Sequence, residues 1–358
     1  MSRQATTLRE IARQADVSVA AVSYVLNGKE GISEPRRRQI GALLKQAGLK
    51  PKHLRYPTFY ICEHKSFADL ASYSPFFQKY EGLNSSFHEA GVGLRVEFLN
   101  RPDARDLRSQ LDALLSYKPG AVILDSDLGD DLPAVARFFE GQGVPALQIG
   151  HTVRAPGVDA VVIDDFGGAY AATRHLVEAG HTRIATIRWR VAEDPASAKK
   201  YAAFQCALQD AGLAERPEYV VQSPPGRRGD RLTGRVAVEQ LLALPEPPTA
   251  VFVENSFVSA SLLYPIDPSE PALPEAIRRL DMVHFEAWHL DVIEQVMAGV
   301  FNYPTRETKL LRVDWADLGR VAAKQIVERL RGAEASGQVI RLTPKLMTVK
   351  ATTATDLI

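Results

Sequence analysis

Apolar residues recur at helical spacing in the first 50 residues of the chain. Leu8, Ile11, Ala12 and Ala15 follow the i, i+3, i+4, i+7 pattern of an amphipathic helix, and Thr7 is a suitable N-cap. The same kind of pattern returns twice more before residue 50. The pattern therefore predicts three short helices at the N-terminal end.

The second helix is predicted to run from Ser18, a favourable N-cap, to about Leu26. Asp16 precedes it, and aspartate is one of the few residues besides glycine that tolerate a left-handed turn. One face of this helix is apolar and is expected to pack inward: Val22, Val25 and Leu26. The opposite face is expected to point outward: Val19, Ala20, Ser23 and Tyr24.

The third helix is predicted to start near Ser33, with Pro35 early in its first turn, and to stop at Gly48. Two helices joined by a tight turn, with a third packed under them, form a helix-turn-helix unit. The outward face of the second helix would then be the reading face. The alternative is a three-helix module that docks onto another protein.

From Thr58 onward, apolar runs of strand length alternate with helical segments. This alternation predicts parallel sheets with helices on both faces, and the run divides near residues 150 to 165. In such folds, ligands bind at the carboxyl ends of strands, often in a cleft between two lobes. The predicted strands are 58–62, 92–99, 121–125, 146–150, 183–189, 218–222, 249–253 and 281–285.

Charge is divided unevenly between the two parts. Residues 1–56 contain eleven Lys or Arg and four Asp or Glu, which is +7, whereas the other 302 residues contain 32 basic and 39 acidic residues, which is −7. A basic head on an acidic body indicates that the head has a polyanionic partner. The alternative is a solvated surface without a partner.

Composition excludes several classes of protein. Cys62 and Cys206 are the only cysteines, so cysteine provides neither a disulfide framework nor a zinc cluster, and we expect no metal. The polar start MSRQATTLRE is not a signal peptide, and no run of about 20 apolar residues appears, so we expect a cytoplasmic protein that does not contact a membrane. The chain shows no nucleotide-binding, nucleophile-elbow or metalloprotease motif, so we expect no cofactor and no enzyme activity.

The segment TLREIARQADVSVAAVSYVLNGKEGISEPRRRQI resembles the DNA-binding head of the lactose-repressor (LacI/GalR) family of bacterial transcription regulators. The resemblance implies that Val19 and Ala20 face base edges and that Ser18, Ser23 and Asn27 hold phosphates. It also implies backbone contacts at the start of the third helix. The full set of DNA contacts that we expect in the head is Leu8, Ser18, Val19, Ala20, Ser23, Tyr24, Asn27, Ser33 and Arg37.

The head departs from the family pattern at three positions. Asp16 stands where the family has Gly, Ala21 where Thr is usual, and Tyr24 where an Arg commonly points into the major groove. Arginine can bind guanine through two hydrogen bonds, whereas tyrosine offers one hydroxyl and an apolar ring, which suit a thymine methyl or a phosphate. Tyr24 therefore predicts a different base preference.

The join between head and body is short. The family has a hinge helix here that enters the minor groove, but this chain reads LKPKHLRYPTFYICE and lacks roughly two helical turns, too little for a helix whose first turn is costly to form. Leu54 is the candidate wedge, and His53 and Arg55 are candidate contacts to phosphates or the minor groove. The alternative is a plain linker.

The body resembles the effector domain of the same family, which is similar to periplasmic sugar-binding proteins. The resemblance rests on SPFFQKYEGLNSSFHEAG, on VVIDDFGGAYAATRHLVEAGHTRIA, and on the closing segments DLGRVAAKQIVERL and LTPKLMTVKAT. It implies an effector site made of carboxylates or amides for sugar hydroxyls and aromatic rings for the apolar face of a sugar. The candidate effector contacts are Phe76, Phe77, Asp164, Trp189, Lys200, Phe204, Asn255 and Glu286.

These positions also depart from the family. The Arg of the family pattern is replaced by Lys200, and its Asn-Asp pair becomes Asn255-Ser256. The segment LLYPIDPSEPALPEA carries several prolines where the family normally has a helix. For each aromatic residue the alternative is core packing, and for Asp164 it is a helix N-cap.

We therefore predict an N-terminal all-α helix-turn-helix head (residues 1–50), a shortened hinge or linker (51–57) and an α/β two-lobed, periplasmic-binding-protein-like body with parallel sheets (58–350). The N-lobe is expected at about 58–160 and the C-lobe at about 161–310, with the chain crossing back near 285–315, and the body is expected to form a homodimer or a higher oligomer. The predicted function is a sequence-specific transcriptional repressor that binds double-stranded operator DNA and is controlled by a sugar-like effector between the lobes. The alternatives are a sugar-binding protein of the transport class and a DNA-binding regulator without small-molecule control.

Overall fold

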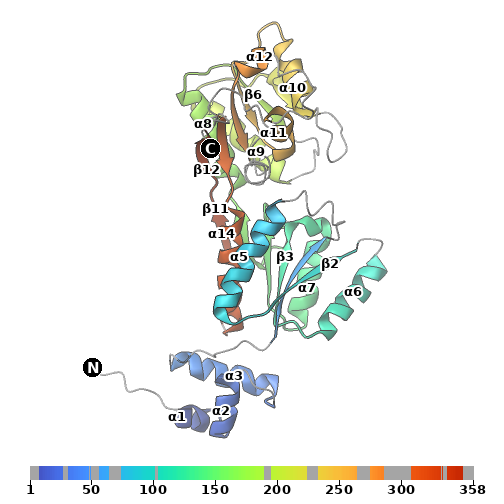
Figure 1. The fold of residues 1–358 in the computed structure, drawn as a ribbon, viewed down its shortest axis with the longest axis vertical. Coiled ribbons are helices and arrows are strands. Elements are labelled where there is room, and N and C mark those ends of the chain that lie inside the picture. Colours follow the sequence, from blue (N-terminus) through green and yellow to red (C-terminus); the bar gives the residue numbers. More distant parts are fainter. Residues whose placement is uncertain are drawn as a thin grey trace, which may run out of the picture. The chain divides into compact units, whose positions relative to one another are not determined.

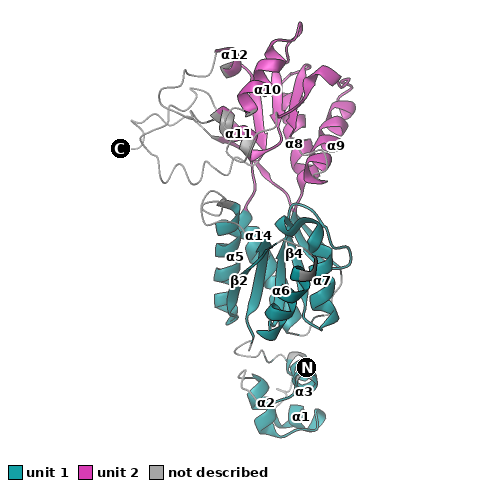
Figure 2. Ribbon diagram, turned by 90° about the vertical axis from the view of Figure 1, so that its right-hand side faces the viewer, with its two compact units in different colours: residues 1–162, 315–341 teal, residues 163–314, 342–358 magenta. Residues whose placement is uncertain are grey.

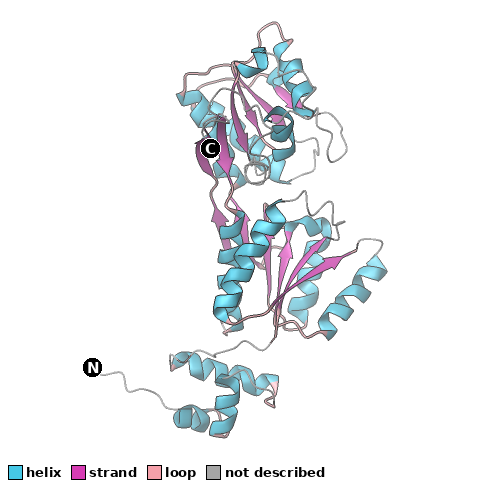
Figure 3. Ribbon diagram, viewed as in Figure 1, coloured by secondary structure: helices cyan, strands magenta, loops and turns pink. Residues whose placement is uncertain are grey.

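The computed structural model describes twelve segments of the chain. These are residues 8–26, 31–47, 49, 56–63, 74–100, 104–188, 195–223, 233–263, 275–285, 308–331, 333 and 337–349. Contacts divide the chain into two compact units, residues 1–162 with 315–341 and residues 163–314 with 342–358 (Figure 2). The first unit contains the helical head and a sheet domain, the N-lobe; the second unit is the C-lobe. The predicted fold class is confirmed (Figure 3).

The head consists of helices α1 (Leu8–Gln14), α2 (Val19–Leu26) and α3 (Glu34–Gln46) (Figure 1). Its core joins residues of all three helices, with Ile11, Val22, Ile40 and Leu44 fully buried. Asp16 has a φ of 52°, so the predicted left-handed turn between α1 and α2 is confirmed. The helical periodicity of the sequence thus located all three helices of the head.

The N-lobe is a six-stranded sheet in the order β11-β5-β4-β3-β1-β2. Helices α6 and α7 cover one face, where Phe59 and Ile61 are buried, and α5 and α14 pack together on the other (Figure 1). The strands are β1 (Thr58–Glu63), β2 (Leu94–Leu99), β3 (Ala121–Asp125), β4 (Ala146–Gly150), β5 (Asp159–Ile163) and β11 (Val339–Leu342). The helices are α5 (Ser74–Ala90), α6 (Ala104–Ser116), a 3₁₀ turn (Ser126–Asp131), α7 (Leu132–Gly141) and α14 (Trp315–Leu330).

The C-lobe is a second six-stranded sheet, in the order β12-β10-β9-β8-β6-β7. Helices α10, α11 and α12 contribute to the core on one face, and α8 and α9 pack together and contact the same sheet. The strands are β6 (Ile184–Arg188), β7 (Val220–Gln222), β8 (Ala250–Val253), β9 (Asp281–Phe285), β10 (Thr308–Arg312) and β12 (Lys345–Val349). The helices are α8 (Asp165–Glu178), α9 (Pro195–Asp210), a 3₁₀ turn (Pro217–Tyr219), α10 (Thr233–Leu242), α11 (Ser256–Leu263) and α12 (Glu275–Arg278).

The strand predictions hold, with additions. All eight predicted strands are present, and the structure adds β5, β10, β11 and β12. The units divide between residues 162 and 163 and between 314 and 315, and a second return between 341 and 342 was not predicted. The predicted parallel sheets are confirmed, and the C-lobe sheet also carries one antiparallel edge strand, where β12 runs antiparallel to β10. An antiparallel edge strand on an otherwise parallel sheet is common in α/β folds.

Candidate DNA-reading helix and effector half-sites

The reading helix α2 begins at a side-chain cap. The hydroxyl of Ser18 accepts a hydrogen bond from the backbone N–H of Ala21, 3.1 Å away. This bond satisfies one of the N–H groups that lack a partner at the start of every helix. The predicted N-cap of the reading helix is therefore present.

The two faces of α2 differ in exposure as the sequence predicts. Val22 and Val25 are 0% and 4% exposed, whereas Val19 and Tyr24 are each 42% exposed. Ala20 is exposed and Ser23 is half-buried. We call Val19, Ala20, Ser23 and Tyr24 the reading face. These residues bear no formal charge, so α2 would contact base edges with methyl groups, one aromatic ring and two hydroxyls.

Three of the other predicted DNA contacts lie in described segments, and four do not. Ser33 is exposed at the start of α3 and Arg37 is half-buried, while Leu8 is half-buried and packs against the core of the head. Arg36 donates a hydrogen bond to the backbone carbonyl of Ala15 at 2.8 Å, so its guanidinium also ties α3 to the end of α1. Four further candidates lie outside the described residues: Asn27, His53, Leu54 and Arg55.

Two predicted effector residues lie on α5 of the N-lobe. Phe76 is 8% exposed and stacks on Tyr60 with ring centroids 5.8 Å apart, whereas Phe77 is 48% exposed and meets Phe76 edge-on at 5.3 Å. Phe76 thus corresponds to the core-packing alternative. Phe77 presents an exposed ring.

A buried charge network lies beside these rings and was not predicted from the sequence. The carboxylate of Asp125, at the end of β3, accepts short hydrogen bonds from the ammonium of Lys79 and the hydroxyl of Tyr60. Lys79 and Asp125 are each 1% exposed, and the Lys79 ammonium lies 5.3 Å from the ring centroid of Trp315. Burial and the charge of Asp125 raise the pKa of Tyr60 well above its ordinary value, so the phenol stays protonated. The one sequence signal was an aspartate that ends a buried strand.

Two of the predicted effector residues of the C-lobe have structural roles, one as a helix cap and one in the core. Asp164 caps α8 by accepting a hydrogen bond from the N–H of Gly167 at 3.0 Å, which is the alternative of a helix N-cap. Phe204 is 1% exposed and stacks on Phe252, as the core-packing alternative describes. Asn255 is half-buried at the end of β8. Trp189 and Glu286 lie outside the described residues.

Lys200 is a buried member of a polar cluster at the carboxyl ends of β6 and β8. It is 4% exposed and pairs with Asp165 at 3.6 Å. Three other members, Arg188, Ser197 and Glu254, were not predicted from the sequence. Ser197 and Glu254 are 57 residues apart in sequence, and their proximity (2.6 Å from Ser197 Oγ to Glu254 Oε1) depends on the fold.

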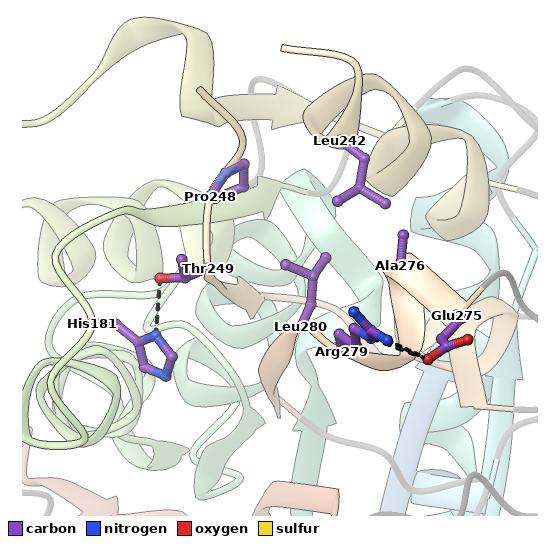
Figure 4. A pocket seen from close by; sticks show the side chains of 8 residues that line it. All are labelled: His181, Leu242, Pro248, Thr249, Glu275, Ala276, Arg279 and Leu280. Carbon is purple, nitrogen blue, oxygen red and sulfur yellow. Dashed lines mark hydrogen bonds and ion pairs between the residues drawn. The ribbon is translucent and has the colours of Figure 1, made fainter. Parts of the chain in front are cut away.

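A pocket of about 590 Å³ lies elsewhere in the C-lobe, at the amino ends of β8 and β9 (Figure 4). His181 bonds to Thr249 through Nδ1 and to Asp281 through Nε2, each at 2.9 Å, and Arg279 pairs with Glu275 at 2.6 Å. The two His181 bonds link the residues at the amino ends of β8 and β9, and the Arg279–Glu275 pair lies at α12. None of the predicted effector residues lines this pocket. We interpret it as a surface depression whose polar side chains stabilise the lobe.

Membrane spans and metal clusters are both absent from the segments that the structure describes. No helix in those segments is long and apolar enough to cross a membrane. In the same segments, no group of three or more His, Cys, Asp or Glu side chains is arranged to hold a metal ion.

Residues 7–52 match the family of bacterial regulatory proteins, lacI family, and residues 70–261 match the periplasmic binding proteins and sugar binding domain of the LacI family. The chain belongs to the LacI family. It is a DNA-binding transcriptional regulator of that family, and the match of the head does not fit the transport-protein alternative.

The following relative and structural neighbours of this LacI-family chain each share about a fifth of its sequence. The HTH-type transcriptional repressor PurR of Aliivibrio salmonicida is 21% identical over 350 residues, which cover 96% of this chain and 98% of the relative. The transcriptional regulator CelR, solved as a cellobiose complex, is 22% identical with a TM-score of 0.62, over 96% of this chain and 98% of that chain. The LacI family transcriptional regulator CCPA of Weissella paramesenteroides, solved with bound sucrose, is 18% identical with a TM-score of 0.59, over 81% and 96%. The family is one of transcriptional regulators rather than enzymes.

Proposed function

We propose that the chain is a transcriptional repressor that reads double-stranded operator DNA through the reading face of α2 and responds to a small molecule bound by its lobes. The observation that carries the proposal is the division of α2 into a buried face and an exposed face. Val22 and Val25 are buried and hold the helix against the rest of the head. Val19 and Tyr24 are exposed and would enter a major groove of DNA. The repressors among its relatives support the direction of control.

The partner follows from charge and site. The head carries the excess of basic residues, which suits phosphates, while the uncharged reading face suits base edges. A homodimer would place two heads on a palindromic operator. Because the partner is chromosomal DNA, the protein would work in the cytoplasm. The sugar-bound neighbours support an effector related to sugars.

The test is selection of binding sequences from a randomised duplex library with the full-length protein. We expect a palindromic consensus whose binding weakens steeply with salt, since phosphate contacts release counterions. An Ala20→Asp variant, which puts a charge on the exposed reading face, should lose binding. Gln46→Asp adds the same charge at the exposed C-terminal end of α3 and should retain the consensus. Recovery of unselected sequence by the wild type would refute the proposal.

A further inference from the structure

The polar cluster of the C-lobe contains two cations in different states. We call it the Arg188 cluster: Arg188 at the end of β6, Ser197 and Lys200 on α9, Glu254 after β8, and Asp165 on α8. All five belong to the same compact unit, and they lie where the carboxyl ends of its strands meet. A ligand of this lobe would meet such an edge first.

Lys200 is enclosed by its neighbours. Its ammonium lies 3.6 Å from a carboxylate oxygen of Asp165 and donates to the backbone carbonyl of Glu254 at 3.3 Å. The ring centroid of Phe285 lies 4.2 Å from the same ammonium. A ligand that bound Lys200 would have to break its buried ion pair with Asp165, which is strongly unfavourable. Lys200 therefore positions the cluster rather than contacting a ligand.

Ser197 and Glu254 are also engaged. The Ser197 hydroxyl donates to the Glu254 carboxylate at 2.6 Å, and the two residues are 2% and 1% exposed. This bond fixes the first turn of α9 against the end of β8. The hydroxyl proton is thus committed to Glu254.

Arg188 is arranged differently. Its guanidinium carbon lies 4.1 Å from the ring centroid of Tyr201, so the ring supports the group, and its Nη2 reaches Ser197 Oγ only at 3.5 Å. Its Nε is buried and has no hydrogen-bond acceptor in the part of the chain that the structure describes. In the same part, no carboxylate lies within 4.0 Å of the guanidinium. The side chain as a whole is half-buried, whereas Lys200 is buried.

The support under Arg188 is itself held in place. The Tyr201 hydroxyl donates a short hydrogen bond to Glu215, and burial together with that bond raises the pKa of Tyr201 to about 12. The ring therefore stays neutral and presents its face to the cation. A guanidinium held this way offers its N–H edge to an oxyanion in a planar, two-bonded geometry.

We propose that Arg188 is the ligand-contacting cation of this lobe and that the effector carries a carboxylate or a phosphate. This inference rests on the proposed function, since it names the chemical class of the effector. Arg188 would bind the oxyanion. The bonds among the other four residues of the cluster would hold this edge of the lobe in one conformation.

The test measures binding to the full-length protein by calorimetry and thermal shift. The probes are common hexoses and pentoses, each supplied as the neutral sugar, its sugar acid and its phosphate ester, with inorganic phosphate alone as a further probe. We expect at least one sugar acid or phosphate ester to bind at least tenfold more tightly than its neutral parent. Comparison of the two anionic forms distinguishes carboxylate from phosphate.

Variants at two positions separate contact from positioning. Arg188→Gln should keep the melting temperature within a few degrees and weaken the anionic probe at least tenfold, and Arg188→Lys should recover part of the loss. Lys200→Gln should lower the melting temperature, because it leaves Asp165 buried without its cation, and should weaken the probe less than Arg188→Gln does. A spectroscopic check of folding accompanies each variant.

Three outcomes would overturn the proposal: tighter binding of a neutral sugar than of its anionic forms, an Arg188→Gln variant that binds the anion as the wild type does, or no binding by any probe. The last result would favour a regulator without small-molecule control. DNA selection with the wild type is run in parallel without ligand. A palindromic consensus there would leave the proposed DNA-binding function intact even if the effector class is wrong.

Discussion

Ser18 and Ala21 form the cap on which the reading helix depends, through a 3.1 Å hydrogen bond from the Ala21 N–H to the Ser18 hydroxyl. Ser18→Ala removes the acceptor, and loss of an N-cap costs about 1 kcal/mol. We expect faster hydrogen exchange of α2 amides in the full-length protein and weaker binding to all DNA sequences alike.

The variant Ser18→Asp separates capping from phosphate contact. Aspartate caps as well as serine does, so exchange in α2 should stay near the wild-type rate. Its negative charge should nevertheless weaken DNA binding if a phosphate lies close to this position. Wild-type affinity of Ser18→Asp in a fluorescence anisotropy titration would show that Ser18 is a cap and no more.

We predict that Tyr24 gives this chain a base preference that differs from that of its relatives. The side chain is 42% exposed, and a Cβ built on Gly31 would lie 4.0 Å from its ring, so the ring lies against the loop before α3. Tyr24→Arg should add a preference for guanine, because arginine can donate two hydrogen bonds to its major-groove edge. Selection from a randomised library should show a changed consensus with a smaller change in overall affinity.

The control for Tyr24→Arg is Gln46→Arg, which adds the same charge at the exposed end of α3. It should strengthen binding modestly and leave the consensus as it was. An unchanged consensus for Tyr24→Arg would contradict the assignment of this residue to base reading.

Sequence periodicity was sufficient to predict the head and most strands, because these elements are local. The three helices and the left-handed Asp16 follow from residues a few positions apart. The chemistry of the C-lobe edge was not predictable in the same way. Lys200 looks like a free cation in the sequence, but Asp165 and Glu254 enclose it only once α8, α9 and β8 have packed.

The N-lobe provides a second example of a contact that depends on folding. Asp125 and Lys79 are 46 residues apart, and their buried pairing needs α5 to lie against the sheet. Sequence pattern places each residue on its element. It does not show which charged residues become buried together.

Gly82 of α5 packs directly against α14. A Cβ added at Gly82 would lie 1.9 Å from the backbone carbonyl oxygen of Ala316, and one added at Gly319 would lie 2.3 Å from that of Lys79. Gly82→Ala should therefore destabilise the N-lobe by about 1–3 kcal/mol, because the two backbones must separate. Denaturant unfolding of the full-length protein would measure this.

Gly141 provides the matched control for Gly82. It ends α7 in the same lobe, and a Cβ at this position would meet nothing within 4 Å. Gly141→Ala should be neutral or slightly stabilising, since alanine narrows the unfolded ensemble. Equal stability of the two alanine variants would contradict the close approach of α5 and α14.

His284 should make the stability of the C-lobe depend on pH. The side chain is 1% exposed on β9, and burial lowers its pKa from 6.5 to about 3. As the pH falls below 6.5, the unfolded chain binds a proton that the folded chain does not bind, so stability is complete above that pH and declines toward pH 3. Between pH 7.5 and 5.5 the loss from this one group should be about 1.4 kcal/mol.

The variant His284→Leu removes this titration while filling a similar volume. Denaturant unfolding at pH 7.5 and 5.5 should show a smaller loss of stability for His284→Leu than for the wild type. Burial also lowers the pKa of His175, so the pH dependence should be reduced rather than abolished. His88→Gln, which removes an exposed imidazole on α5, is the control for losing a histidine. If His284→Leu and the wild type lost equal stability between these two pH values, His284 would not be a buried neutral imidazole in solution.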